Sequence, residues 1–353
     1  MTPSFAGSQG GLASTWNITS LEEAEHISET RFGIIGKATR FATEKDDTFR
    51  IVSASGESHV LKIANPDEAW EEVSFQVELL NHILVQDPGM PVPRVGVDRQ
   101  GLQISPLQFD GGVVRFARML TYMEGTPLDQ LVTVPSERRK VGLILGRLRH
   151  ATAGFGHSGD SRVLAWDVQH LPGLERLLVQ IADNGRRAML EEGFARFSTL
   201  IERIANSRQQ VLHNDFSRSN IVVDKASGDY VTGIIDFGDS VRTAIAIDVS
   251  TALLNQLPTV AAPDLFLEGR DLLDGYLEVA DLTDDELTLV PHLVMGRIIA
   301  RALLTTWRAS ILPDNSTYIL RNTEQGWSQL GWFLDRSFDE VSEALVRKRN
   351  WQR

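Results

Sequence analysis

Three polar side chains stand at the ends of two short apolar runs, where they could carry chemistry together. Asp215 and Asn220 precede the run at 221–223. Asp236 follows the second run, at 231–235, and opens an Asp-Phe-Gly sequence. The polar and glycine residues between the runs predict a turn, so that the two runs form a β-hairpin. The hairpin would bring two carboxylates and an amide oxygen to one point.

That set of oxygens suits phosphoryl transfer. In this chemistry a carboxylate accepts the proton of the attacking hydroxyl, while other oxygens hold Mg²⁺ against the nucleotide phosphates. The spacing Asp-x4-Asn followed by Asp-Phe-Gly is the arrangement that protein kinases use. We therefore assign Asp215 as the catalytic base, and Asn220 and Asp236 as ligands of Mg²⁺. The alternative is a plain hairpin with solvated acidic ends, which either motif alone would fit. The presence of both motifs, Asp-x4-Asn and then Asp-Phe-Gly, favours a nucleotide site. The role of Asp239 stays open.

A lysine upstream fits the same site. Lys62 ends an apolar strand pattern, and a buried ammonium group needs an anion beside it. Nucleotide phosphates and a glutamate of the next helix would supply that charge. This helix is predicted to begin at Asn65, and Glu78 on the edge of its inward face is the expected partner. Glu71 and Glu72 compete for the role, and a surface lysine with a buried stem is the alternative.

Two further segments are assigned to the nucleotide by their position. The polar turn at 42–48, which contains Thr43, lies between two predicted strands where kinases cover the phosphates, although it lacks G-x-G-x-x-G. The segment 118–125 would join two lobes and bind the purine through its backbone. Met119 and Tyr122 are its candidates for a base slot, and the choice between ATP and GTP stays open.

The sequence around the predicted site resembles the aminoglycoside phosphotransferase and choline kinase superfamily, the small-molecule relatives of protein kinases. The resemblance rests on HNDFSRSN, which ends at Asn220, and on GIIDFGD, which contains Asp236. The superfamily usually has glycine where Asn214 stands. Protein kinases usually carry lysine where Ser217 stands, which favours a small-molecule acceptor. Asp248 resembles the aspartate that braces the catalytic loop of the superfamily.

The expected fold is an α+β, bilobal, protein-kinase-like fold. Residues 1–15 are predicted to be a disordered lead, and residues 16–122 a small nucleotide-binding lobe with an antiparallel sheet. Residues 123–353 are predicted to form a larger, mainly helical lobe for catalysis and acceptor binding. The resemblance implies Mg²⁺ and a nucleoside triphosphate, ATP or GTP, as phosphate donor.

Several outer segments resemble hydroxylysine kinase and its relatives, over nearly the whole chain. This resemblance implies a free hydroxylated amino acid as the acceptor. Arg297 and Arg301, four residues apart on one predicted helical face, could bind its carboxylate, and Asp167 its amine. Pairing of these arginines with acids inside the lobe is the plain alternative.

Other acceptors stay open, namely homoserine, choline-like amino alcohols and aminoglycosides. A catalytically silent nucleotide-binding relative is a third class of function. Such a relative should have lost one of the polar residues of the site, yet Lys62, Asp215, Asn220 and Asp236 are all present.

The amino-acid composition limits the partners and the cellular location that are expected for the protein. The chain has 353 residues, a formal net charge of −12 and no cysteine. The negative charge disfavours a nucleic-acid partner, and the absence of cysteine excludes disulfides. The N-terminal residues lack the pattern of a secretory signal, and no membrane partner is expected. The sequence predicts a soluble, cytoplasmic protein and does not indicate its oligomeric state.

Overall fold

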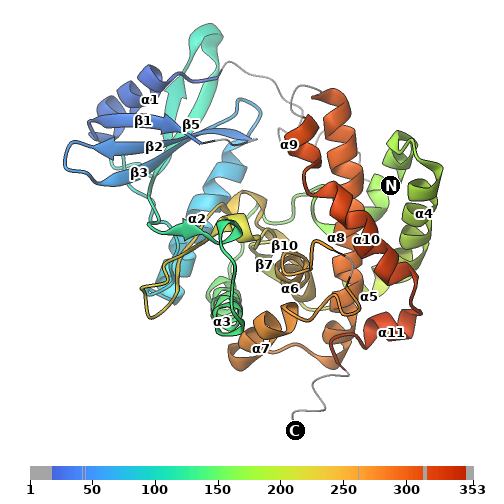
Figure 1. Ribbon diagram of the computed structural model, residues 1–353. Coiled ribbons are helices and arrows are strands. Elements are labelled where there is room, and N and C mark those ends of the chain that lie inside the picture. Colours follow the sequence, from blue (N-terminus) through green and yellow to red (C-terminus); the bar gives the residue numbers. More distant parts are fainter. Residues whose placement is uncertain (1–17, 42, 44, 261, 313–315, 347–353) are drawn as a thin grey trace.

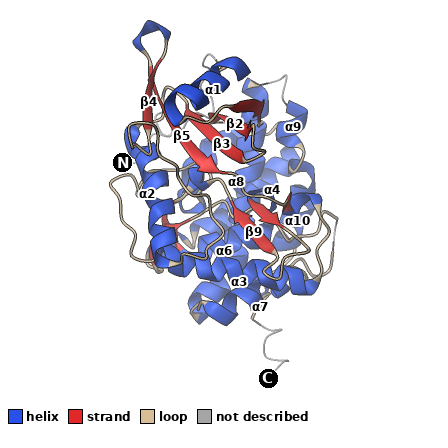
Figure 2. Ribbon diagram, turned by 90° about the vertical axis from the view of Figure 1, so that its left-hand side faces the viewer, coloured by secondary structure: helices blue, strands red, loops and turns tan. Residues whose placement is uncertain are grey.

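The computed structural model describes residues 18–41, 43, 45–260, 262–312 and 316–346 (Figure 1). A small part built on an antiparallel sheet stands beside a larger, mainly helical part, so the predicted α+β, protein-kinase-like fold is confirmed. Figure 2 shows that the strands of the small part lie above a mass of helices. The predicted disordered lead at 1–15 lies outside the described residues.

The small part contains a five-stranded antiparallel sheet in the order β1-β2-β3-β5-β4. Its strands are β1 (Gly36–Arg40), β2 (Asp46–Ser53), β3 (Ser58–Ala64), β4 (Ser105–Gln108) and β5 (Val114–Thr121). Because side chains alternate across a strand, one face of β3 buries Leu61 and Ile63 against α1 (Leu21–Ile27). The other face carries Lys62. The predicted lobe boundary after residue 122 follows β5 directly.

Helix α2 (Trp70–Gln86) begins later than the sequence indicates. The side chain of Asn65 accepts a hydrogen bond from the Asp67 N–H, 2.9 Å away, and its amide donates to the Lys45 carbonyl at 2.7 Å. Asn65 therefore closes a local turn and ties it to the loop before β2 instead of capping a helix. The regular helix therefore starts only at Trp70.

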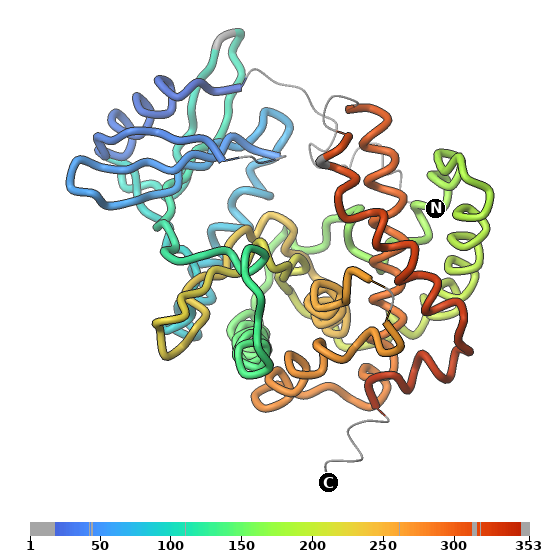
Figure 3. The backbone as a smooth tube through the Cα atoms, viewed as in Figure 1, coloured from blue at the N-terminus to red at the C-terminus, as the bar shows by residue number. Residues whose placement is uncertain are grey.

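The larger part packs its helices around one long buried helix, α8 (Asp284–Ile311). Figure 3 follows the chain as it passes from the sheet into the helices. The other helices are α3 (Pro135–Thr152), α4 (Asn184–Ser198), α5 (Ile201–Ala205), α6 (Ile245–Leu254), α7 (Gly269–Val279), α9 (Ser316–Leu320), α10 (Thr323–Leu334) and α11 (Phe338–Ser342). Helix α8 is long and apolar enough to cross a membrane, but 89% of its apolar window is buried inside the protein. It is therefore the core helix of this fold.

Two glycines bring α3 and α7 into backbone contact. A Cβ atom on Gly142 would lie 1.8 Å from the Leu272 carbonyl oxygen, and one on Gly275 would lie 1.9 Å from that of Arg139. Any larger residue would push the helices apart. The pair fixes the floor of the helical part, on which the catalytic segments rest.

The predicted hairpin is present as β8 (Ile221–Val223) and β9 (Val231–Ile234). It forms a three-stranded sheet with β6 (Thr126–Pro127), while β7 (Gln209–Leu212) pairs with β10 (Val241–Ala244). The Ile235 N–H donates to the Asn220 carbonyl at 2.9 Å. This bond holds the polar ends of the hairpin side by side.

Candidate active site

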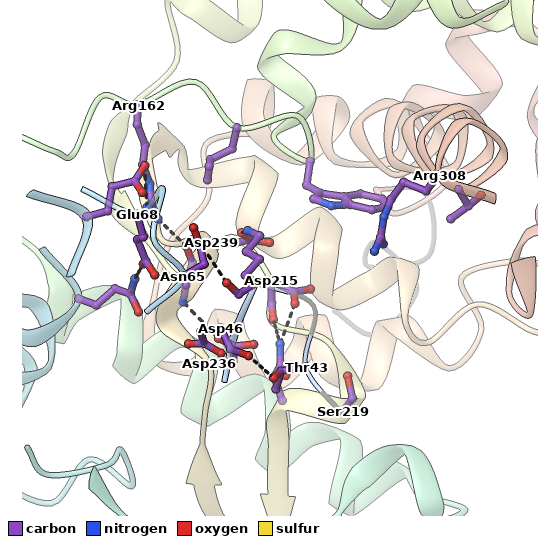
Figure 4. A pocket seen from close by; sticks show the side chains of 18 of the residues that line it. Thr43, Asp46, Asn65, Glu68, Arg162, Asp215, Ser219, Asp236, Asp239 and Arg308 are labelled. Atoms are coloured by element: carbon purple, nitrogen blue, oxygen red, sulfur yellow. Dashed lines mark hydrogen bonds and ion pairs between the residues drawn. The ribbon is translucent and has the colours of Figure 1, made fainter. Parts of the chain in front are cut away.

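A cavity of about 600 Å³ lies between the sheet and the helical part. Residues of both parts line it, and Figure 4 shows their side chains converging from both sides. Asp46 and Lys62 come from the sheet, Asp215 and Asp236 from the segments that flank the hairpin, and Arg301 from α8. Seven of the predicted site residues thus meet at the junction of the two parts, namely Thr43, Lys62, Asp215, Asn220, Asp236, Arg297 and Arg301.

The hairpin brings the catalytic side chains together. The Asn220 amide donates to the Asp215 carboxylate at 2.7 Å and to the Asp215 carbonyl at 3.0 Å. His213 contacts the Ile235 carbonyl through Nε2 at 3.0 Å, which fixes the loop against the end of β9. Asp236 follows directly and lines the same cavity. This is the convergence that the spacing predicts.

The loop before Asp215 is braced from the helical part. Asn214 adopts a left-handed conformation with φ 60°, which asparagine tolerates better than most residues. Its N–H donates to the Asp248 carboxylate at 2.8 Å, and its side-chain oxygen accepts from Arg297 at 2.9 Å. Arg297 also donates to the Asn214 carbonyl. Asn214 therefore adopts the left-handed backbone conformation that glycine would adopt at this position, and its side chain adds hydrogen bonds that glycine cannot make.

Asp215 is electrostatically suited to take up a proton. Burial raises the pKa of this carboxyl to about 7, and the negative charges of Asp239 and Asp236 act in the same direction. The Arg297 guanidinium and the Asn220 amide oppose the rise without cancelling it. A base whose pKa lies near neutrality combines a useful deprotonated fraction with real affinity for the proton.

Lys62 lies between two carboxylates. Its Nζ is 3.2 Å from Asp46 Oδ2 and 3.5 Å from Asp236 Oδ1. Burial alone would lower the pKa of Lys62, but these two negative charges outweigh it and raise the pKa. The Lys62 charge in turn lowers the pKa of Asp236 to about 2. Asp236 is therefore ionised at neutral pH, as a metal ligand must be.

The prediction that Glu78 partners Lys62 is wrong. Its side chain is 57% exposed, and it lies 3.7 Å from the His157 ring. Glu72 rather than Glu78 lines the cavity, and it approaches Arg162 at 4.0 Å. The partner of Lys62 is Asp46 of β2. Strand pairing offered a signal, since Thr48 opposes Lys62 and Asp46, two residues away, shares its face.

The loop between β1 and β2 adds a second lysine that sequence reasoning missed. Lys45 forms an ion pair with Asp239, three residues after Asp236, and so joins the sheet to the helical part. This pair lowers the pKa of Asp239, although its burial acts in the opposite direction. Thr43 also lines the cavity, and its hydroxyl donates to the Asp46 carbonyl at 2.6 Å. The loop thus presents side chains, rather than a glycine-rich backbone, to the phosphate position.

Arg162 is another missed residue of the site. It lies in the segment after α3, donates to the Gly238 carbonyl at 2.5 Å and to the Ser240 carbonyl at 2.9 Å, and lines the cavity. Its guanidinium lies over the Phe75 ring of α2 at 5.4 Å. Arg162 therefore links α2 to the turn that follows Asp236. A single arginine in an irregular segment gives no sequence pattern by which to find it.

The two base-slot candidates differ in position. Met119 opposes Leu61 in the sheet and packs in the core beneath α1, on the face away from Lys62, so its predicted place in the base slot is wrong. Tyr122 lies just beyond β5, and its ring stacks on Phe41 with centroids 6.5 Å apart. The Arg50 guanidinium lies 4.2 Å from the Tyr122 centroid. Tyr122 stays a candidate for contact with the purine.

The three residues predicted to bind the acceptor also differ in their position relative to the cavity. Asp167 is fully buried, accepts from Thr243 at 3.1 Å and from Gln169 at 2.6 Å, and lies behind the cavity wall, so it does not bind an amine there. Arg297 lines the cavity, but its guanidinium donates hydrogen bonds to the carbonyl and side-chain oxygens of Asn214. Arg301 lines the cavity one helical turn further on. Only Arg301 of the three keeps its predicted place toward an acceptor.

Comparison with known proteins decides the family. Residues 37–282 match the family described as phosphotransferase enzyme family, APH, which is more than half of the chain. The chain belongs to this phosphotransferase family. It is a small-molecule kinase with an alcohol group as acceptor.

Relatives of this phosphotransferase cover most of its length. It is 24% identical to hydroxylysine kinase of Mus musculus over 91% of both chains. It is 23% identical to homoserine kinase of Sinorhizobium fredii over 79% of this chain and 82% of that protein. Among solved structures, a microcompartment-associated aminopropanol kinase has a TM-score of 0.72 at 17% identity, with 93% of this chain and 99% of that chain covered. An amicoumacin kinase in complex with AMP-PNP, Ca²⁺ and Ami has a TM-score of 0.67 at 16% identity, with 87% and 93% covered.

The raised pKa of Asp215 predicts a pH-dependent cost in the stability of the phosphotransferase. The folded state holds the proton up to about pH 7, whereas the unfolded chain releases it near the ordinary value of 3.8. Stability is therefore lost as pH rises through this window. We expect Asp215→Asn to gain roughly 2–3 kcal/mol over the wild type between about pH 5 and about pH 8. Urea unfolding of both proteins without metal measures the difference, and a difference that stays constant with pH would contradict the assignment.

The corrected partner of Lys62 gives a matched pair of variants. Asp46→Asn removes the nearest negative charge from Lys62 and leaves its ammonium less well positioned, so we expect a KM for nucleotide about 10–100-fold higher. Glu78→Gln should change this KM by less than about two-fold, because Glu78 is exposed and distant from Lys62. Steady-state kinetics with varied nucleotide compares the two. An equal rise in the KM for nucleotide in Glu78→Gln would show that Glu78 does act as the partner of Lys62.

Proposed function

We propose that this phosphotransferase transfers the γ-phosphate of ATP or GTP to a hydroxyl of a free hydroxylated amino acid, as the name of its relative hydroxylysine kinase indicates for that protein. One observation carries the proposal. Asp215 stands between a group suited to nucleotide phosphates and Mg²⁺, made by Lys62, Asn220 and Asp236, and a cavity wall rich in arginine. A small acceptor that reaches Asp215 from the arginine wall would face the nucleotide in line.

The residues of the site divide the work of transfer. Asp215 orients the acceptor hydroxyl and takes its proton, while Asn220 holds the Asp215 carboxylate in place. Lys62 positions the phosphates, and its positive charge stabilises the negative charge of the phosphoryl group during transfer. Transfer is direct, without a phosphorylated enzyme, so positioning and charge neutralisation supply most of the acceleration.

The donor set at the hairpin fits Mg²⁺. Asp236 and Asn220 offer a carboxylate and an amide oxygen, and Mg²⁺ takes one or two such ligands together with phosphates and water. Among the described residues, no cluster of three or more His, Asp or Glu forms a complete metal cage, as this mode of binding requires none. When bound, Mg²⁺ would neutralise the phosphate charge between donor and acceptor.

Two similar proteins support an alternative acceptor. The match to a homoserine kinase and the fold shared with an aminopropanol kinase support a shorter hydroxylated acceptor as the second candidate. A silent relative is disfavoured, because Lys62, Asp215, Asn220 and Asp236 all reach one cavity.

A panel of acceptors tests the proposal. Phosphate transfer from ATP and from GTP, with Mg²⁺, is measured for hydroxylysine, homoserine, amino alcohols and an aminoglycoside. We expect the highest kcat/KM with a hydroxylated amino acid. No transfer to any acceptor, with nucleotide still bound, would favour the silent relative instead.

A further inference from the structure

The acceptor side of the cavity is strongly basic. Among the described residues, the segment 297–322 contributes four arginines to the wall and no aspartate or glutamate. Figure 4 shows Arg308 on one side of Asp215, with Asp46 and Asp236 on the other. The acids of the cavity therefore lie at the catalytic centre and toward the sheet, whereas the wall beyond Asp215 carries positive charge. An ammonium group that faces this wall would meet repulsion, whereas a carboxylate would be attracted to it.

Arg301 is a buried residue of this wall whose guanidinium has a neutral hydrogen-bond partner and no carboxylate acting on it. Its Nη2 donates to the neutral Gln329 side chain at 3.0 Å, and its buried Nε has no hydrogen-bond partner among the described residues. Burial lowers the pKa of Arg301 to about 10, with no carboxylate acting against it. A guanidinium that is held in place yet lacks a counter-ion suits a carboxylate, because its forked N–H groups match the two oxygens.

The position of Arg301 sets the reach of an acceptor. Arg297 holds the loop of Asp215, and the helical rise places Arg301 about 6 Å further along α8 and Arg308 about 16 Å further. A hydroxyl at Asp215 and a carboxylate at Arg301 would thus belong to one small molecule a few bonds long. Arg308 is too far away for such an acceptor and instead adds to the positive field.

We propose that this wall selects the acceptor by a carboxylate bound at Arg301, and that the acceptor's ammonium group contributes little to selection. The second half follows from Asp167, whose carboxylate is buried behind the wall and bonded to Thr243 and Gln169. The inference rests on the proposed function and names the feature of the acceptor that the site recognises. Amino alcohols and aminoglycosides, which lack a carboxylate, are accordingly poor acceptors.

Three related acceptors test the inference with the wild-type enzyme. They are hydroxylysine, the same compound without its α-amine, and the same compound without its carboxylate. We expect loss of the amine to change kcat/KM by less than about ten-fold, and loss of the carboxylate to lower it by about 10²-fold or more. The same comparison for homoserine covers the shorter acceptor.

Variants then assign the preference to one residue. Arg301→Gln should lower kcat/KM for the acceptor with a carboxylate much more than for the amino alcohol, so that the advantage of the carboxylate is lost, and Arg301→Lys should restore part of it. Arg139→Gln, which changes an exposed arginine paired with Glu278, is the matched control. Thermal unfolding with each acceptor and nucleotide reports binding independently of turnover.

The outcomes separate the inference from the function on which it rests. Equal or better use of the acceptor without its carboxylate overturns the inference and leaves the kinase intact. An unchanged preference in a folded Arg301→Gln variant also overturns it. If no acceptor is phosphorylated although nucleotide binds, both the function and the inference fail.

Discussion

Replacement of Asp215 by Asn is expected to lower kcat by about 10²–10⁴. Asparagine keeps the size of the side chain and an oxygen that can accept from Asn220, 2.7 Å away in the wild type. It cannot take up a proton, so the attacking hydroxyl must lose its proton without help. Binding of nucleotide should change little, since Lys62 and Asp236 are untouched. Phosphate transfer and nucleotide affinity, measured on the same preparation, separate the two effects.

A control for this variant lies on the same hairpin. Asp224→Asn alters an exposed carboxylate in the turn between β8 and β9, where it accepts from the Ala226 N–H, and it should leave kcat unchanged. Undiminished transfer by Asp215→Asn would remove Asp215 from the role of base. In the wild type, kcat/KM should fall as pH drops below about 7, because protonated Asp215 cannot accept the proton.

Replacement of Asp236 by Asn is expected to lower kcat/KM by about 10³-fold, through loss of a charged metal ligand. In the wild type, Mg²⁺ should strengthen nucleotide binding, because Asp236 would hold the ion and the ion would neutralise phosphate charge. In Asp236→Asn that gain should largely disappear. Lys62 keeps its contact with Asp46 in the variant, so binding without Mg²⁺ should be affected less. Nucleotide titrations at several Mg²⁺ concentrations give the coupling directly.

Asp239→Asn provides the sharpest comparison, since Asp239 is a nearby carboxylate in the same cavity that pairs with Lys45. We expect this variant to keep the gain in affinity from Mg²⁺, because Asp236 is unchanged. If instead Asp239→Asn loses the coupling and Asp236→Asn retains it, the metal ligand is Asp239.

The sequence predicted those parts of the site that depend on local order. Asp215, Asn220 and Asp236 lie at the ends of one hairpin, so their meeting follows from a single turn and two short strands. The α+β fold followed from strand patterns before residue 122 and helical patterns after it. Such features need only the period of apolar residues and the chemistry of turns.

The remaining errors come from contacts between distant segments. Glu78 lies at the edge of the predicted inward face of α2, but its side chain is exposed, and Asp46 of the neighbouring strand meets Lys62 instead. Lys45 meets Asp239 across 194 residues, and no local pattern reports such a pair. Arg297 and Arg301 share a helical face, yet only packing shows that Arg297 is occupied by Asn214. The periodicity of a sequence predicts the face of a helix or strand on which a side chain lies, but it does not predict which residue that side chain contacts.

The two ion pairs that cross between the sheet and the helical part have a consequence for nucleotide entry. Without nucleotide, Lys62 and Lys45 are held by Asp236 and Asp239, which come from the other side of the cavity. The internal carboxylates therefore act as stand-ins for phosphate, and they prevent mutual repulsion between the lysines. A triphosphate that entered the cavity would replace the carboxylates as the partner of the two lysines, and Asp236 would then be available to hold Mg²⁺. Binding would thus be an exchange of counter-ions at lysines that are already held in place, which lowers the entropy cost of ordering them.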